Sequence, residues 1–141
     1  MRRVINVTVV LIVMGLISLS FTFPKEEKKT KKVKNVILLI GDGMGLSQMS
    51  SAYYYQDKTP NFSRFPFVGL SRTSASSHKI TDSAAGATAL SSGKKTYNGA
   101  IGVGPDTNAV KTILEYYHEK GNSTALIATS SITHATPASF Y

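Results

Sequence analysis

Cysteine is absent from this sequence of 141 residues. Its absence excludes disulfide bonds, thiolate zinc sites and a cysteine nucleophile. Any metal ion that the chain binds must therefore be held by oxygen atoms or imidazole nitrogens.

Three glycine-containing motifs are absent as well. The dinucleotide fingerprint G-x-G-x-x-G and the phosphate loop G-x-x-x-x-G-K-[ST] do not occur. The glycines of this chain therefore do not indicate a nucleotide site. The G-x-S-x-G turn, which exposes the nucleophile of many serine hydrolases, does not occur either.

Acidic residues are scarce, because eight Asp plus Glu stand against sixteen Lys plus Arg, for a formal net charge of +8. The excess lies near the N-terminus. Residues 1–34 hold eight Lys plus Arg against two Glu, whereas residues 35–141 hold eight against six. A nearly neutral folded part does not indicate a nucleic-acid partner.

The N-terminus has the features of an export signal. Arg2 and Arg3 precede an uncharged apolar run over residues 4–23, and small residues at 18–20 have the spacing of a cleavage site. We predict a signal peptide over residues 1–20. An uncleaved membrane anchor over residues 4–23 remains open, because about 20 residues can cross a bilayer. Either interpretation places the rest outside the cytoplasm, periplasmic or secreted.

The segment 21–34 is rich in Lys and Glu and is predicted to be a solvated linker. Residues 35–141 are then predicted to be the N-terminal part of a larger catalytic domain. The sequence ends on the apolar residues Phe140 and Tyr141 without a helix stop or a polar tail, which favours a truncated domain.

Hydrophobic patterning predicts an α/β fold. Three apolar runs are predicted to be strands: residues 36–40, 67–73 and 124–129. Three segments are predicted to be helices: residues 46–56, 82–92 and 109–120. Because runs without alternation are typical of strands covered on both faces, we expect a mostly parallel central sheet with helices on both faces.

Asp42 stands between two glycines directly after the first predicted strand. Ligands bind at the carboxyl ends of strands in open α/β sheets, and the glycines allow a ligand to approach the backbone closely. A carboxylate at this place suits Mg²⁺ or Zn²⁺. An ordinary tight turn is the alternative.

Ser83 follows Thr81 and Asp82, either of which can cap a helix that has Ser83 in its first turn. The N-terminus of a helix presents N–H groups and positive potential to an anion such as phosphate. A nearby dication could activate the hydroxyl by lowering its pKa. The alternative is that Ser83 merely belongs to a capping segment.

His134 and Thr136 alternate with Ala135, so in an extended backbone their side chains leave on one side. Pro137 favours extended geometry at the preceding residue. Such a pair could bind a metal directly or through water. The two other histidines, His78 and His118, are interpreted as surface or satisfied residues.

Together these motifs resemble the alkaline phosphatases. The matching stretches cover almost all of residues 35–141: N-V-I-L-L-I-G-D-G-M-G at 35–45, T-D-S-A-A-G-A-T-A at 81–89, K-T-Y-N-G at 95–99 and T-H-A-T-P-A at 133–138.

The resemblance implies a role for each candidate residue. Asp42 would bridge the second zinc and the magnesium, and Ser83 would be the nucleophile that becomes phosphoseryl and contacts that zinc. Asp82 would orient the arginine that binds phosphate. Thr136 would be a ligand of the magnesium site. His134 departs from the family pattern that has aspartate at this place and resembles the pattern that has histidine, and imidazole favours zinc or cobalt over magnesium.

The resemblance also implies the reaction, which is hydrolysis of small-molecule phosphate monoesters through a phosphoserine intermediate, with two Zn²⁺ and one Mg²⁺, in a homodimer. In such enzymes the phosphate-binding arginine and the remaining zinc ligands follow beyond the last matching motif. We therefore expect the 141-residue chain to be inactive alone.

Two other functions remain open at this stage. One is a phosphodiesterase-like member of the same superfamily, which also includes sulfatases and phosphoglycerate mutases with a shared metal scaffold. The other is a membrane-tethered module that binds a metal or phosphate without catalysis.

Overall fold

The computed structural model describes residues 33–141, and the chain divides into two compact units, Met1–Leu38 and Leu39–Tyr141. The predicted signal peptide and most of the predicted linker lie outside the described residues. The described part of the first unit, residues 33–38, has no helix or strand. All helices of the described residues lie in the second unit.

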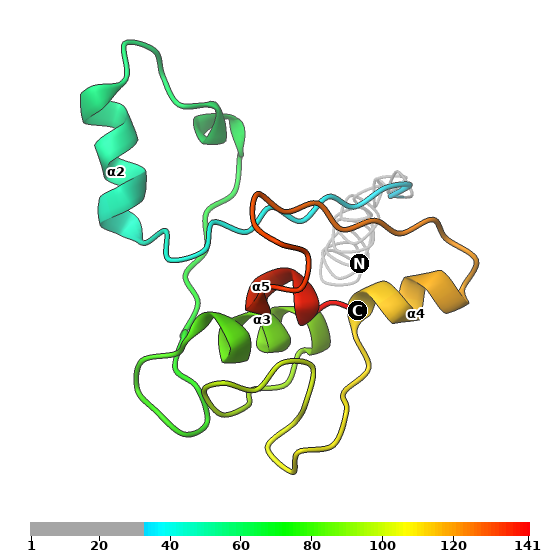
Figure 1. The fold of residues 1–141 in the computed structure, drawn as a ribbon. Coiled ribbons are helices and arrows are strands. Elements are labelled where there is room, and N and C mark those ends of the chain that lie inside the picture. The colour runs from blue at the N-terminus through cyan, green and yellow to red at the C-terminus, as the bar shows by residue number, and fades with distance from the viewer. Residues whose placement is uncertain (1–32) are drawn as a thin grey trace, which may run out of the picture. The chain divides into compact units, whose positions relative to one another are not determined.

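The described residues form five helical segments, which Figure 1 shows along the chain. They are α2 (Leu46–Tyr55), the 3-10 helix η1 (Asn61–Arg64), α3 (Ser83–Ser92), α4 (Ile113–Glu119) and α5 (Ala135–Ala138). The predicted helices over residues 46–56 and 82–92 are confirmed to within one residue at each end.

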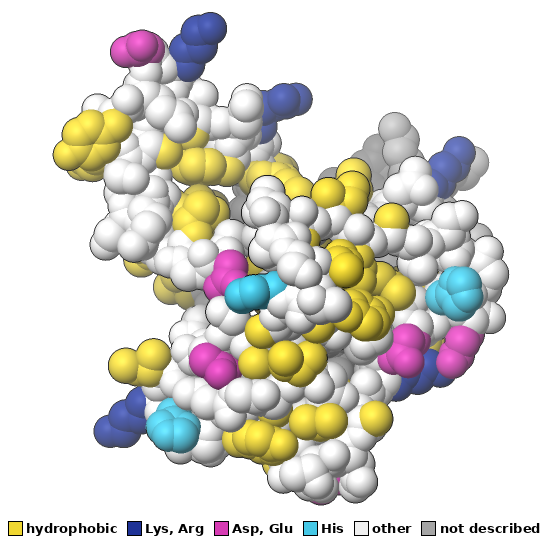
Figure 2. Space-filling view, viewed as in Figure 1, with side chains coloured by type: hydrophobic (Ala, Val, Ile, Leu, Met, Phe, Trp, Pro, Cys, Tyr) yellow, Lys and Arg dark blue, Asp and Glu magenta, His cyan; other side chains and the backbone are white. Residues whose placement is uncertain are grey.

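No strand forms within residues 33–141, where the one β-pairing is an isolated antiparallel bridge between Val103 and Ala109. The predicted strands 36–40, 67–73 and 124–129 have no regular structure. Their apolar side chains are uncovered, since Val68 is 95% and Ile127 97% exposed. Figure 2 shows such hydrophobic side chains spread over the visible surface. A strand needs a neighbour for its backbone groups, and none pairs with these runs in the described part of the chain.

Helix α3 lies at the centre of the packed region, where it contacts α5 and, less extensively, α4 (Figure 1). Its buried side chains are small: Ala84, Ala85, Ala87, Thr88 and Ser91. Small side chains let neighbouring backbone approach closely, so the packed region is compact but buries little apolar volume. Ala100 and Phe140 are buried as well.

The Thr88 side chain, at the centre of this region, forms hydrogen bonds that join α3 to the loop after it and to the end of α5. It is fully buried. The Thr88 hydroxyl donates to the carbonyl oxygen of Ala100 at 2.9 Å and accepts from the N–H of Gly102 at 3.0 Å. The Ser139 hydroxyl lies 3.2 Å from it and donates to the carbonyl oxygen of Ala135 at 2.8 Å. The loop after α3 and the end of α5 are therefore held to the same face of α3.

Helix α4 is shorter than the predicted range 109–120, because it begins at Ile113 with Thr112 as its N-cap. The Thr112 hydroxyl accepts from the N–H of Glu115, and the Glu115 carboxylate accepts from the N–H of Thr112 at 2.7 Å, which forms a capping box. Ala109 is held in the bridge to Val103 and cannot join the helix. Within residues 33–141, no helix is long and apolar enough to span a bilayer.

Candidate active site

Asp42 lies at the corner of a tight turn. The N–H of Met44 donates to the carbonyl oxygen of Gly41 at 3.1 Å, which closes the turn. Gly43 has a φ of +66°, a left-handed conformation that glycine adopts without steric cost. The turn leaves the Asp42 side chain exposed and free to reach other segments.

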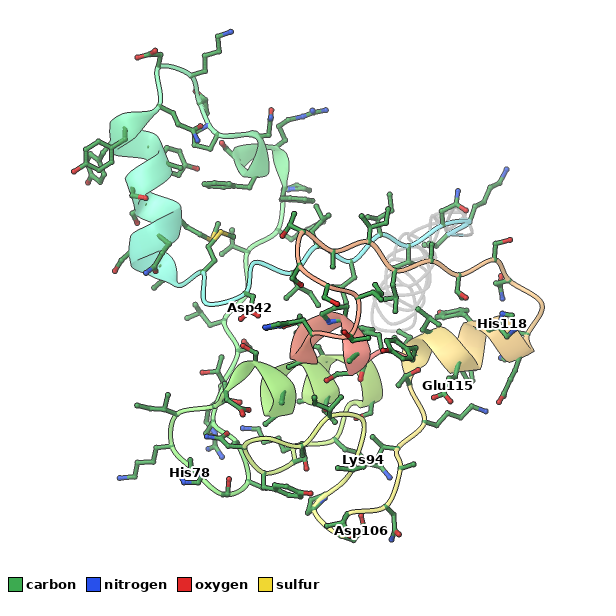
Figure 3. All side chains as sticks on the ribbon, in the orientation of Figure 1. Asp42, His78, Lys94, Asp106, Glu115 and His118 are labelled. Atoms are coloured by element: carbon green, nitrogen blue, oxygen red, sulfur yellow. The ribbon has the colours of Figure 1, made fainter. Side chains whose placement is uncertain are left out.

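The two oxygens of the Asp42 carboxylate accept from two different segments. The Ser83 hydroxyl donates to Oδ1 at 3.0 Å, and the Thr136 hydroxyl donates to Oδ2 at 2.6 Å. Asp42 accordingly lies next to α3 and α5 in Figure 3. The structure thus brings together three of the residues that the sequence predicted as site residues.

These contacts hold the pKa of Asp42 below its ordinary value of 3.8. The largest cause is the hydrogen bond from Thr136, followed by that from Ser83, and the charge of His134 and the backbone of Gly43 add smaller effects. Each of these favours the ionised form. Asp42 is therefore a carboxylate at neutral pH and a weak base.

Ser83 is the first residue of α3 and Asp82 is its N-cap. Asp82 Oδ1 accepts from the N–H of Ala85 at 2.9 Å, and Oδ2 accepts from the N–H of Gly99 at 2.6 Å. The N–H groups of Ser83 and Ala84 have no carbonyl partner inside the helix, because the first turn never does. The Ser83 hydroxyl, which is half-buried, thus lies beside free N–H donors suited to an anion.

The extended conformation predicted around Thr136 is wrong. Thr136 lies in the first turn of α5, and His134 is the exposed N-cap with φ −67° and ψ 153°. Pro137 is compatible with this helix because a first-turn residue needs no N–H for an intrahelical bond. The Thr136 hydroxyl donates to Asp42 from the first turn of α5, and the charge of His134 lowers the pKa of Asp42.

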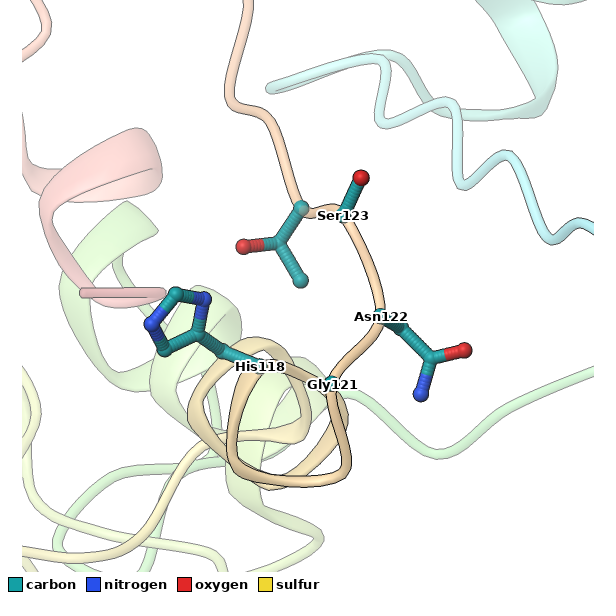
Figure 4. Close-up of a pocket in the computed structure, with 5 residues that line it drawn as sticks. His118, Gly121, Asn122 and Ser123 are labelled. Carbon is teal, nitrogen blue, oxygen red and sulfur yellow. The ribbon is translucent and has the colours of Figure 1, made fainter.

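The other two histidines, His78 and His118, form no hydrogen bond with the residues predicted for the site. His78 Nδ1 lies 2.7 Å from the Ser77 hydroxyl on an exposed segment. His118 lies at the end of α4 and lines a surface pocket, shown in Figure 4. The pocket is lined by His118, Gly121, Asn122, Ser123 and Thr124. None of the residues predicted for the site is among them.

The oxygen atoms at and around Asp42 are of the chemical type that binds divalent cations. They comprise one carboxylate and the hydroxyl oxygens of Ser83 and Thr136, which are ligands of the type that Mg²⁺ accepts and that Zn²⁺ accepts in part. Within residues 33–141, no three His, Asp or Glu side chains come close enough to hold a metal. The three side chains of Asp42, Ser83 and Thr136 could therefore provide some of the oxygen ligands of a metal site, but not a complete set.

Asn98 and Gly99 were not predicted as site residues, yet both contact Asp82. The Asp82 N–H donates to Asn98 Oδ1 at 3.1 Å, and Gly99 donates to the Asp82 carboxylate. Their stretch, K-T-Y-N-G, was part of the resemblance, but an Asn-Gly pair by itself indicates only a turn. A pattern of residue types does not reveal a partner 16 residues away.

Comparisons with known proteins agree with one another. The family model described as alkaline phosphatase matches residues 33–141. Alkaline phosphatase 3 of Bacillus subtilis (strain 168) is 49% identical over an alignment of 124 residues that covers 82% of this chain and 27% of the relative. The alkaline phosphatase from the Antarctic bacterium TAB5 has a solved structure similar to this one, with a TM-score of 0.69 and 57% identity over 71% of this chain and 29% of that one.

A variant of the TAB5 enzyme, in which one histidine is replaced by glutamate, has been solved with Mg bound in the M3 site. It is 56% identical to this chain, with a TM-score of 0.69 over 71% of this chain and 29% of the variant. The chain spans about a quarter of the length of the Bacillus relative. The family match covers everything that the structure describes. This chain belongs to the alkaline phosphatase family.

Proposed function

We propose that residues 33–141 contribute the nucleophile and part of the metal site of a phosphate monoester hydrolase. One observation carries the proposal: a single carboxylate, Asp42, receives the Ser83 hydroxyl on one oxygen and the Thr136 hydroxyl on the other. A carboxylate held between a helix-terminal serine and a second hydroxyl suits a site where a cation and a phosphate meet.

Ser83 is proposed to attack phosphorus in line with the leaving alcohol. The bond from Ser83 Oγ to phosphorus forms as the hydroxyl proton is released to solvent. The bond from phosphorus to the alkoxide oxygen breaks, and the alkoxide takes a proton from solvent. Water later attacks the phosphorus, which releases inorganic phosphate and restores the Ser83 hydroxyl. The free N–H groups at the start of α3 would receive the phosphate oxygens. Asp42, with its lowered pKa, accepts a hydrogen bond from Ser83 without removing its proton at neutral pH. Bound metal ions would lower the pKa of the Ser83 hydroxyl and stabilise the departing alkoxide.

The metal content proposed for the complete enzyme is two Zn²⁺ and one Mg²⁺. Asp42, Ser83 and Thr136 would provide oxygen donors, and His134 would provide an imidazole at the third site. Imidazole favours zinc or cobalt there over magnesium. The Mg bound by the TAB5 variant with glutamate in place of a histidine supports a link between this kind of ligand and the metal at that site.

The complete protein is proposed to be exported, to act on small phosphate monoesters and to form a homodimer. Residues 33–141 provide neither a full set of zinc ligands nor, within the motifs they contain, an arginine placed to bind phosphate. We therefore propose that the 141-residue chain has no turnover of its own.

Turnover can be tested in a chimera. Residues 33–141 would replace the matching segment of Bacillus subtilis alkaline phosphatase 3, so that the relative supplies the remaining three quarters of the enzyme. We expect the chimera to hydrolyse p-nitrophenyl phosphate and to form phosphoserine at position 83, detected by acid quench and mass spectrometry. We expect no hydrolysis by the 141-residue chain above its own Ser83→Ala variant.

The matched control is Ser92→Ala, at the other end of α3, where the hydroxyl donates to the carbonyl oxygen of Thr88. This variant should keep the activity of the chimera, whereas Ser83→Ala should abolish both turnover and labelling. Turnover by a folded Ser83→Ala chimera at the parent rate would show that Ser83 is not the nucleophile.

A further inference from the structure

The segment 95–99 follows α3 and turns back beside the segment that leads into it. The Lys95 ammonium donates to the carbonyl oxygens of Arg72 at 3.1 Å and Ser74 at 2.6 Å. The N–H of Ser76 donates to the carbonyl oxygen of Thr96 at 2.8 Å. Figure 3 shows the two segments that carry these contacts around the labelled His78 and Lys94. The segment of chain that leads into Ser83 is therefore held by hydrogen bonds at several residues.

The two segments also meet at Asn98, whose side-chain amide bridges two backbone groups just before Ser83. Nδ2 donates to the carbonyl oxygen of Ile80 at 3.1 Å, and Oδ1 accepts from the N–H of Asp82 at 3.1 Å. The amide thus pairs with alternate residues as a neighbouring strand would. Only a side chain with both a donor and an acceptor at this length can make both bonds.

The Asp82 side chain contacts the same segment, since its carboxylate accepts from the N–H of Gly99 at 2.6 Å. Asp82 is therefore held by its backbone N–H, through Asn98, and by its side chain, through Gly99 and Ala85. We call these contacts of Asp82 with Asn98 and Gly99 the Asp82 clasp. The clasp fixes the residue whose backbone turns from extended (φ −94°, ψ 178°) into the helix that begins with Ser83.

We propose that Asn98 is a positioning residue for Ser83. The inference rests on the proposed function of Ser83 as nucleophile. Asn98 makes no hydrogen bond to Ser83 or Asp42, but it fixes the backbone of Asp82, directly before Ser83. Loss of the amide frees this backbone, and the Ser83 hydroxyl no longer keeps its place 3.0 Å from Asp42. A shift of about 1 Å in a reacting group can cost about 100-fold in rate.

Two variants separate positioning from packing. Asn98→Leu keeps the size and removes both hydrogen bonds, and Asn98→Asp keeps an acceptor for the Asp82 N–H while losing the donor for the Ile80 carbonyl. The matched control is Asn122→Leu, because the Asn122 amide also donates to a backbone carbonyl, that of Tyr117, at 3.1 Å. All three are made in the chimera described above and in the 141-residue chain.

For p-nitrophenyl phosphate hydrolysis by the chimera, we expect Asn98→Leu to lower kcat by about 10- to 100-fold, with KM within about threefold of the parent. Asn98→Asp should lose less, since one bond remains, and Asn122→Leu should keep the parent kcat. In the 141-residue chain, hydrogen exchange of the Asp82 and Gly99 amides by NMR should quicken in Asn98→Leu and stay unchanged in Asn122→Leu.

The two proposals fail in different ways. If the chimera with Ser83→Ala keeps its turnover, the proposed function fails, whatever Asn98 does. If Ser83→Ala is inactive but Asn98→Leu and Asn98→Asp keep the parent kcat, the positioning role alone is overturned. The positioning role is also overturned if Asn98→Leu leaves exchange of the Asp82 amide unchanged, and this second readout decides the question when the chimeric variant does not fold.

Discussion

The Ser83 hydroxyl donates to Asp42 Oδ1 at 3.0 Å, across 41 residues of sequence. The other oxygen of the same carboxylate receives Thr136, 94 residues away. The turn at residues 41–43 and the first turns of α3 and α5 therefore meet at a single carboxylate. Because both hydroxyls are held by a charged acceptor, the charge of Asp42 sets the geometry of the whole cluster.

Removal of that charge should abolish most of the activity. In the chimera, Asp42→Asn keeps the size of the side chain but removes the negative charge that the two hydroxyls and any cation would meet. We expect kcat/KM for p-nitrophenyl phosphate to fall by at least about 100-fold, the upper range for groups that support a metal site. The control Asp57→Asn changes an exposed carboxylate outside the matching motifs and should leave kcat/KM unchanged. Equal activity of the two variants would contradict a role for Asp42.

Removing either hydroxyl partner of Asp42 should raise the pKa of its carboxyl group, and the two substitutions should differ in the size of their effect. Thr136 is the larger cause of the lowered pKa and Ser83 the smaller one, so Thr136→Val should raise the pKa more than Ser83→Ala does. The measurement is a carboxyl ¹³C NMR titration of the 141-residue chain. Asp106 is the internal control, because its own lowered pKa comes from Asn108 and should not respond to either substitution.

The same shift predicts how stability depends on pH. Because the pKa of Asp42 is lower in the folded chain than the ordinary 3.8, its hydrogen bonds stabilise the fold fully at pH values above 3.8. The contribution is lost as the pH falls below 3.8 and through the lower folded pKa. Urea denaturation of Asp42→Asn, followed by circular dichroism, should therefore show a flatter decline below pH 4 than the parent chain. An identical decline would mean that Asp42 is not held by these bonds.

Two buried threonines offer a matched test of the packed region. Thr88 and Thr96 are both fully buried, but Thr88 has hydrogen-bond partners, whereas the Thr96 hydroxyl has none in the described part of the chain. Thr88→Val leaves the N–H of Gly102 without its acceptor and should lower the free energy of unfolding by about 1–3 kcal/mol. Thr96→Val removes a hydroxyl without a hydrogen-bond partner among the described residues, and the free energy of unfolding should stay unchanged or rise. Urea denaturation of both variants measures the difference, and equal losses would contradict it.

Local signals predicted α3 well. Asp82 accepts from Ala85 as an N-cap, and Gly93 ends the helix in a left-handed conformation with φ +73°, so both boundaries follow from residues at the helix ends. Caps act within one turn, which is why they can be recognised in a sequence. The start of α4 at Ile113, directly after the N-cap Thr112, follows the same rule through its capping box, although the apolar periodicity alone placed it too early.

Long-range features could not be predicted in the same way. An apolar run such as residues 36–40 indicates a strand, but a strand forms only when a neighbour pairs with it, and the sequence does not state which segment that is. The contact of Asp42 with Ser83 and Thr136 likewise depends on three segments far apart in sequence. The resemblance grouped these residues by role, whereas the structure provided their geometry and the clasp around Asp82.

His134 allows a test of the proposed third metal site. Its imidazole favours zinc or cobalt, whereas a carboxylate favours magnesium, because hard cations prefer oxygen ligands. In the chimera, His134→Asp should shift the bound metal toward magnesium. Purified protein equilibrated with equal Zn²⁺ and Mg²⁺ and then desalted should retain more magnesium and less zinc, measured by inductively coupled plasma mass spectrometry. His118→Asp, a change at the end of α4, is the control and should leave the metal content as in the parent. If His134→Asp also leaves the metal content unchanged, His134 is not a ligand of this site, and its influence is limited to the charge that lowers the pKa of Asp42.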